Sequence, residues 1–232
     1  MIRIYYMRIE GDCSNEQSLA LYKMLPKERK ESVDRAKNQE IARKRLYTGA
    51  FMQYVLSKET GLLGEQLHYE YNQWGKPELE NIQNIHFNLS HSGKYVVLAV
   101  SDCPVGIDVE HKTRGYASLS KRFFCEEEYN DIMSAPLEME RERLFLECWT
   151  KKEAYIKCVG KGMQIPLNSF QIQKGECGVS SVLDENHFFR TMFLDEEYCM
   201  SVCSLSQTDM EASVDTKNLL TPICIAEIWK EK

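Results

Sequence analysis

The sequence predicts an α+β fold built by duplication, in which two similar halves each pack helices on a mainly antiparallel sheet. The segment 43–47 reads RKRLY, and 141–145, placed 98 residues later, reads RERLF; each leads into a long helix-like stretch. The strand-like segment 95–101, YVVLAVS, is echoed 103 residues later by YCMSVCS at 198–204. Because both similarities occur in the same order and at nearly equal spacing, we expect two halves related by a pseudo-twofold axis.

Each half is expected to contain a strand, a helix, a long helix and then a meander of strands. Turn-forming residues at 102–104 separate the strand 95–101 from the strand 105–110, which puts the boundary between residues 1–103 and 104–232. Ligands favour the crevice between such halves, so functional residues should come from both. The alternative is a chance similarity of two amphipathic helices.

Composition narrows the class of protein. The chain has 232 residues and a net charge of −6, from 29 basic and 35 acidic side chains, which argues against a nucleic-acid binder. No apolar run approaches the roughly 18 residues of a membrane span, and the opening MIRIYYMRIE lacks a secretory signal pattern. Nine irregularly spaced cysteines fit reduced thiols better than a disulfide framework. We therefore expect a cytoplasmic protein.

Basic residues are nevertheless concentrated in one segment of the first half. Eight positive side chains fall within nineteen positions: Lys27, Arg29, Lys30, Arg35, Lys37, Arg43, Lys44 and Arg45. Such a cluster can hold an anionic ligand even on an acidic protein. The alternative is an ordinary solvated helical face.

A pair of carboxylates ends the predicted strand 105–110, which reads VGIDVE. Asp108 and Glu110 are two positions apart, so in a strand they point to the same face. Like charges this close raise each other's pKa unless a cation lies between them. Mg²⁺ suits such a place because it is held by a few carboxylates together with phosphates and water. The alternative is a solvated pair on an edge strand.

Two further segments carry groups suited to phosphate chemistry. WTKKEAYIK at 149–157 has a helical pattern ended by GKG, so Glu153 and Lys157 lie one turn apart on one face. Ser90 and His91 lie in HFNLSHSG at 86–93, a short strand running into a polar turn that could cradle a phosphate. The alternatives are a surface Glu-Lys pair and a plain hairpin turn.

Taken together and in this order, FNLSHSG, VGIDVE and WTKKEAYIK followed by GKG resemble the Sfp-type phosphopantetheinyl transferases. The resemblance spans nearly the whole chain and includes GKP at 75–77 and KRFF at 121–124. It implies an enzyme that transfers 4'-phosphopantetheine from coenzyme A to a serine of an apo acyl or peptidyl carrier protein, releasing 3',5'-ADP. Coenzyme A would be the co-substrate and Mg²⁺ the cofactor.

The resemblance also implies roles for single residues in the second half. Asp108, Glu110 and Glu153 would be the magnesium ligands. Glu153 would accept the proton of the carrier serine as general base, directly or through water. Lys157 would neutralise the pyrophosphate as charge builds on the leaving nucleotide.

Further roles fall in the first half, where the resemblance places the nucleotide. Lys27, Lys30, Arg45 and His91 would hold its 3'-phosphate. The segment 26–31 can be slid by one position against the family pattern, so the contacts of Lys27 and Lys30 stay open. Lys76 and the backbone around Ser90 would contact the other nucleotide phosphates.

The carrier protein itself would dock on local features, because both it and this chain are acidic. Candidates are Lys112, Arg114, Lys121, Arg122, Phe123 and Phe124, although the two phenylalanines could equally be core. A nucleotide hydrolase is disfavoured because there is no Walker-type loop. A non-catalytic coenzyme A-binding or carrier-binding module would be expected to lack a metal ligand or Lys157, and none is missing. Two halves in one chain favour a monomer, and the carrier's pathway stays open among nonribosomal peptide, polyketide, siderophore and fatty-acid synthesis.

Overall fold

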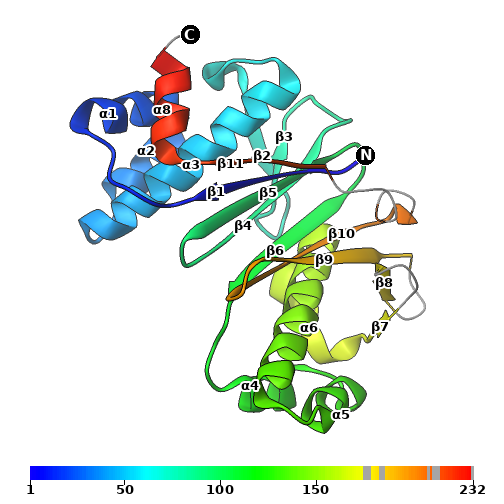
Figure 1. Cartoon of the computed structure of the whole chain (residues 1–232). Coiled ribbons are helices and arrows are strands. Elements are labelled where there is room, and N and C mark those ends of the chain that lie inside the picture. Colours follow the sequence, from blue (N-terminus) through cyan, green and yellow to red (C-terminus); the bar gives the residue numbers. More distant parts are fainter. Residues whose placement is uncertain (175–178, 183–185, 208–209, 211–214, 231–232) are drawn as a thin grey trace.

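The computed structural model describes residues 1–174, 179–182, 186–207, 210 and 215–230. Figure 1 shows four layers: helices, a sheet, a second sheet and further helices. The two sheets lie against each other at the centre, and each is covered on its outer face by its own helices. The predicted α+β class is confirmed.

The first half places three helices on one face of its sheet. Its strands run in the order β11-β1-β5-β4, and the β1–β5 and β5–β4 pairs are antiparallel. A separate hairpin, β2-β3, lies beside them. Its elements are β1 (Arg3–Arg8), α1 (Asn15–Met24), α2 (Lys27–Asp34), α3 (Gln39–Thr60), the 3₁₀ turn Gly64–Gln66, β2 (Tyr69–Tyr71), β3 (Pro77–Leu79), β4 (His86–Ser92) and β5 (Tyr95–Ser101).

The second half repeats this arrangement on an antiparallel sheet of order β6-β10-β9-β8-β7. Its elements are β6 (Val105–His111), α4 (Tyr116–Phe123), α5 (Glu126–Ser134), α6 (Glu138–Val159), the 3₁₀ turns Gly162–Gln164 and Leu167–Ser169, β7 (Ile172–Lys174), β8 (Val179–Val182), β9 (Phe188–Asp195) and β10 (Tyr198–Ser204).

The long helix and three strands of each half correspond, so the predicted duplication is confirmed. The strand order β1-β5-β4 corresponds to β6-β10-β9, and the echoed segments fall on corresponding elements, α3 with α6 and β5 with β10. Both long helices have 22 residues and end at a glycine in the left-handed conformation, Gly61 (φ 74°) and Gly160 (φ 79°). A residue without a Cβ adopts this C-terminal cap without strain.

The last part of the chain returns to the first half. Strand β11 (Asp215–Leu220) pairs in parallel with β1, and helix α8 (Pro222–Lys230) packs on α1 and α3. Ile225 and Ala226 of α8 are fully buried in the hydrophobic core between the first sheet and its helices. Residues 215–230 were assigned by sequence to the second half, and the structure differs here because β1 would otherwise present an unpaired edge.

The two sheets meet in an apolar layer that joins the halves. Ile4 and Val97 from the first sheet pack against Ile107 and Val202 from the second, all fully buried. Behind β6, helix α6 approaches very closely at Gly106, where a Cβ would collide with the Ala154 carbonyl and the Cys158 amide. Gly106 therefore sets the distance between the strand and the helix that carry the predicted site.

Other expectations concern the membrane and the cysteines. Within the part of the chain that the structure describes, no helix combines the length and apolar character that crossing a bilayer requires. No disulfide joins the eight cysteines that lie in the same ranges.

Candidate functional site

Asp108, Ser90 and Lys157 form a hydrogen-bonded triangle where the two halves meet. Asp108 on β6 is 2% exposed, and its Oδ1 accepts hydrogen bonds from Lys157 Nζ at 2.6 Å and Ser90 Oγ at 2.8 Å. Lys157 Nζ also donates to Ser90 Oγ at 3.0 Å. The triangle thus joins β4 of the first half with β6 and α6 of the second.

Strand β4 lines this junction with alternate polar side chains, which share one face because strand periodicity is two. Asn88 Oδ1 accepts a hydrogen bond from the Ile107 backbone amide at 2.9 Å. Two residues further on is Ser90 of the triangle, and two further still Ser92 Oγ donates to Glu110 Oε2 at 2.8 Å. Asp108 and Glu110 are therefore both held from the first half, on the common face predicted for them.

Glu153 on α6 completes a set of three acidic side chains around Lys157, here called the carboxylate site (Asp108, Glu110 and Glu153). Partial burial, then the negative charge of Asp108 and Glu110, raises the pKa of Glu153 to about 7 against the attraction of Lys157. Burial likewise raises the pKa of Asp108, although Lys157 opposes it. Burial and the charge of Asp108 raise that of Glu110. The three carboxyls thus repel one another. Among the described residues, Lys157 is the cation that offsets part of their negative charge.

The chemistry of this set fits a hard divalent cation. Asp108 Oδ2 is buried and accepts no hydrogen bond from the described part of the protein, so one acidic oxygen is left for a ligand. Carboxylate oxygens are the donors that Mg²⁺ prefers. As they stand, no three His, Cys, Asp or Glu side chains in the described ranges are arranged closely enough to enclose a metal ion. A cation would have to draw Glu110 and Glu153 toward Asp108.

A basic pocket of about 330 Å³ lies in the first half, and one of its lining residues, His91, is near enough to Lys157 and Asp108 for both to affect its pKa. Four of its lining residues can carry positive charge and are here called the anion pocket: Arg29, Lys44, Arg45 and His91. His91 directly follows Ser90 on β4. Desolvation of its ring, and then repulsion by Lys157 and Lys44, lowers the pKa of His91 below its ordinary value. The pocket is thus within electrostatic reach of Lys157 and suited to a phosphate group.

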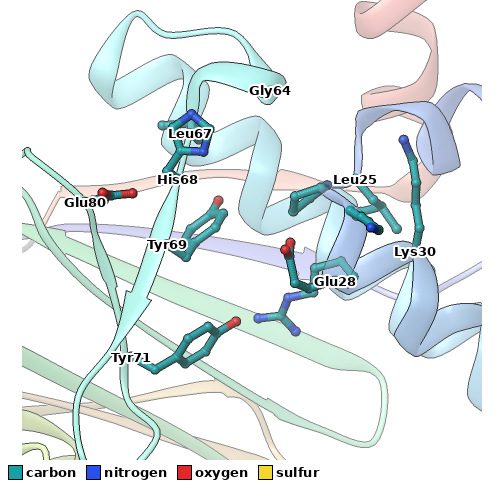
Figure 2. Close-up of a pocket in the computed structure, with 12 residues that line it drawn as sticks. Leu25, Glu28, Lys30, Gly64, Leu67, His68, Tyr69, Tyr71 and Glu80 are labelled. Atoms are coloured by element: carbon teal, nitrogen blue, oxygen red, sulfur yellow. The ribbon is translucent and has the colours of Figure 1, made fainter.

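The structure does not bring Lys27 and Lys30 into the anion pocket. Both line a separate pocket of about 620 Å³ between α2 and the β2 hairpin. Figure 2 shows Tyr71 and Tyr69 pointing into this pocket opposite Glu28, with the Lys30 side chain directed away from them. The Lys30 ammonium lies 5.8 Å from the centre of the Tyr22 ring. The contacts of these lysines to a 3'-phosphate stay a prediction. Arg29 lines both pockets, and it is the residue of this segment that lies beside Arg45 and His91.

Lys76 also lies differently from what the sequence suggested. Its Nζ donates to the carbonyl oxygens of Val105 and Cys158, both at 3.2 Å. The ammonium is therefore engaged by the second half of the protein itself. Its predicted contact with nucleotide phosphates stays a prediction that requires these hydrogen bonds to break.

The residues expected to meet the carrier protein divide between surface and core. Arg114, Lys121 and Arg122 are exposed. Phe124 is 5% exposed and stacks on Phe145, with ring centres 5.5 Å apart, so it belongs to the core. Phe123 is partly buried and packs edge-on against Trp149. Lys112 is half-buried like Phe123, so Arg114, Lys121 and Arg122 are the exposed members of the set that could form a docking surface.

Sequence reasoning missed three residues of the site. Arg29 and Lys44 were recognised as part of the basic segment but not as lining of the anion pocket. Ser92 was not assigned, although its spacing of two from Ser90 on the same strand would have predicted a place on the same face.

Comparisons with known proteins identify the family of the chain. The family model described as the 4'-phosphopantetheinyl transferase superfamily matches residues 104–203, and a model of the N-terminal part of 4'-phosphopantetheinyl transferase matches residues 12–103. The 4'-phosphopantetheinyl transferase ffp of Bacillus subtilis is 32% identical over 207 residues, which cover 88% of this chain and 92% of the relative. Sfp of Bacillus subtilis strain 168 is 30% identical with the same coverage, and psf-1 of Bacillus pumilus is 38% identical over 70% of this chain and 71% of its own. The chain therefore belongs to the Sfp-type 4'-phosphopantetheinyl transferases.

Proposed function

We propose that this protein transfers the 4'-phosphopantetheine group of coenzyme A to a serine of an apo acyl or peptidyl carrier protein and releases 3',5'-ADP. The observation that carries the proposal is the Ser90–Asp108–Lys157 triangle, which places acidic and basic groups together at the junction of the two halves. The anion pocket opens beside it, at Arg45 and His91. Such a site can hold a nucleotide in the anion pocket and a reacting phosphoryl group at the triangle.

Binding of coenzyme A would use the first half. Its 3'-phosphate carries charge that Arg29, Lys44, Arg45 and His91 can balance. Lys157 is near enough to His91 to affect its pKa, so a nucleotide held in the anion pocket would lie within electrostatic reach of Lys157. In this proposal, a 3'-phosphate bound in the anion pocket would leave the pyrophosphate near Lys157.

Transfer would use the second half. The carrier serine Oγ forms a bond to the β-phosphorus while the bond from that phosphorus to the bridging oxygen of the pyrophosphate breaks, and 3',5'-ADP leaves with the electron pair. Glu153, whose pKa is about 7, is matched to accept the serine proton near neutral pH. Lys157 has three N–H donors and uses two on Asp108 and Ser90, so the third can stabilise charge on the leaving group.

Magnesium is part of the proposal, with Asp108, Glu110 and Glu153 as the residues that would hold it. When bound, the ion would neutralise the mutual repulsion of these carboxyls and the charge of the pyrophosphate. The buried Asp108 Oδ2 without a hydrogen-bond partner in the described residues supports this assignment. The non-catalytic alternative has less support because Asp108, Glu110, Glu153 and Lys157 are all present and close to one another.

Incubation with coenzyme A, Mg²⁺ and an apo carrier protein tests the proposal. Mass spectrometry should show the carrier heavier by one phosphopantetheine arm, with one equivalent of 3',5'-ADP formed. Asp108→Asn should abolish the transfer while leaving the circular dichroism spectrum unchanged. If several apo carriers all keep their mass with the wild-type protein, the enzymatic function is wrong.

We also propose a physiological setting. Two matching halves in one chain suit an enzyme that completes its site as a monomer, which analytical ultracentrifugation would check. Cysteines without disulfides in the described ranges suit a reducing compartment such as the cytoplasm. Comparison of kcat/KM across apo carriers of nonribosomal peptide, polyketide, siderophore and fatty-acid synthesis would identify the partner.

A further inference from the structure

We propose that Asn72 and Lys76, in the turn between β2 and β3, form a clamp that positions the C-terminal end of α6 and with it Lys157. The clamp reaches from the first half to the second and holds the two elements between which the Lys157–Asp108 contact is made. This inference rests on the proposed transfer reaction and assigns two positioning residues to it.

The turn itself is built around the Asn72 side chain. Its Oδ1 accepts hydrogen bonds from the backbone amides of Trp74 at 2.9 Å and Lys76 at 3.0 Å. The backbone amide of Asn72 donates a hydrogen bond to the backbone carbonyl of Lys76 at 3.0 Å. Gly75, with φ 85°, is the residue of the turn in the left-handed conformation. The Asn72 side chain is thereby fixed on its oxygen side, which leaves its amide nitrogen aimed at the other half.

That nitrogen holds the cap of α6. Asn72 Nδ2 donates to the Gly160 carbonyl oxygen at 2.9 Å. Gly160 ends α6 in the left-handed conformation, and its own amide donates to Ile156 at 3.0 Å. The carbonyls of the last turn of a helix have no partner within the helix, so a donor from outside stabilises that turn. Lys157 lies in this turn.

Lys76 supplies the second contact and reaches both elements at once. Its ammonium donates to the Val105 carbonyl at the start of β6 and to the Cys158 carbonyl near the end of α6. These positions are three residues from Asp108 and one residue from Lys157. Burial lowers the pKa of Lys76, and the two carbonyl oxygens compensate part of its lost hydration.

The clamp matters for catalysis because the Lys157–Asp108 contact joins the same two elements. Lys157 Nζ lies 2.6 Å from Asp108 Oδ1, so a shift of the end of α6 relative to β6 changes this distance directly. A displacement of about 1 Å at a catalytic group can cost about a hundredfold in rate. Loss of the clamp should therefore lower kcat more than it weakens binding of coenzyme A.

Two variants isolate the clamp, and one serves as a control. Asn72→Asp removes the amide donor to Gly160 but keeps the oxygen that builds the turn. Lys76→Met removes the ammonium and keeps the length of the side chain. Asn84→Asp makes the same chemical change as the first variant at an exposed turn position of the same half.

Three measurements are made on each variant of the full chain: hydrogen–deuterium exchange over residues 154–162, the Kd of coenzyme A by calorimetry, and kcat with a carrier protein. We expect faster exchange in both clamp variants and a kcat lowered by about ten- to hundredfold. The Kd should stay within about a factor of three. Asn84→Asp should match the wild type in all three.

Other results would overturn the inference. If Lys76→Met weakens coenzyme A binding tenfold or more with kcat unchanged, Lys76 contacts the nucleotide rather than positions α6. Exchange and kcat both equal to wild type would show that the contacts have no positioning effect. Faster exchange with unchanged kcat would show a structural role alone. If the wild-type protein transfers no arm, the proposed function fails, while the exchange measurement still decides whether the clamp holds α6.

Discussion

Replacing Glu153 by glutamine should make the metal-free protein more stable at alkaline pH. Glu153 is partly buried and feels the negative charge of Asp108 and Glu110, and its pKa rises from 4.5 to about 7. The folded protein therefore holds this proton more tightly than the unfolded chain does. Stability is unaffected below the unfolded value of 4.5, and it decreases as the pH rises from there to about 7.

The size of the effect follows from this difference. A rise in the pKa of this size means that ionisation of the carboxyl destabilises the folded state by at most about 3 kcal/mol. Because the Glu153 side chain keeps part of its exposure, solvent screening reduces the expected effect to about 1–2 kcal/mol. For a chain of this length that corresponds to a melting temperature higher by about 3–6 °C.

Differential scanning calorimetry in a chelating buffer at about pH 8 and about pH 4 measures this directly, since the carboxyl is mostly ionised in both the folded and the unfolded protein at the higher value and mostly protonated in both at the lower one. Glu153→Gln should melt higher than wild type at the alkaline pH and equally at the acidic one. Addition of Mg²⁺ should stabilise the wild type and not the variant. Glu142→Gln, on the same helix, is the control. A variant that melts lower than wild type at alkaline pH, or gains the same amount at both, would refute the electrostatic reasoning.

Three further predictions follow from the same geometry. Gly106→Ala should abolish activity and lower the urea midpoint, because the added Cβ would collide with the Ala154 carbonyl and push α6 from β6; a normal midpoint would contradict the close packing. In the wild type, affinity for 3',5'-ADP should rise as the pH falls below 6.5, the ordinary histidine value, because the His91 ring has a lowered pKa and gains its proton beside the anion in that range; His91→Gln should flatten this profile in calorimetric titrations. Lys152→Met should destabilise the protein by about 3–5 kcal/mol in urea unfolding, because it leaves the buried Glu128 without its cation. An additional Glu128→Gln change should recover part of that loss.

Local patterns in the sequence were sufficient for much of the fold and the centre of the site. The echoed segments predicted the duplication because corresponding helices and strands keep their periodicity. The spacing of two between Asp108 and Glu110, and of four between Glu153 and Lys157, fixes which side chains share a face once strand and helix are assigned. The structure has these groups around one junction.

Contacts that depend on the direction of a helix or a turn were beyond local patterns. Whether Lys30 or Arg29 faces the anion pocket is decided by the rotation of α2, which a segment that can be aligned in two ways does not specify. Lys76 points to carbonyls of the other half because of how the halves pack. The pairing of β11 with β1 joins segments about 210 residues apart and leaves no periodic signal.

The return of β11 and α8 to the first half also determines the order in which the protein can fold during synthesis. The strands and helices from β6 to β10 leave the ribosome as one continuous stretch and can form their sheet without waiting for later residues. The first sheet acquires its β11 edge only after residues 215–220 have been made, although β1 is translated first. The half that is predicted to bind the nucleotide should therefore be the last to reach its final stability, and chaperones would meet it with the β1 edge still open.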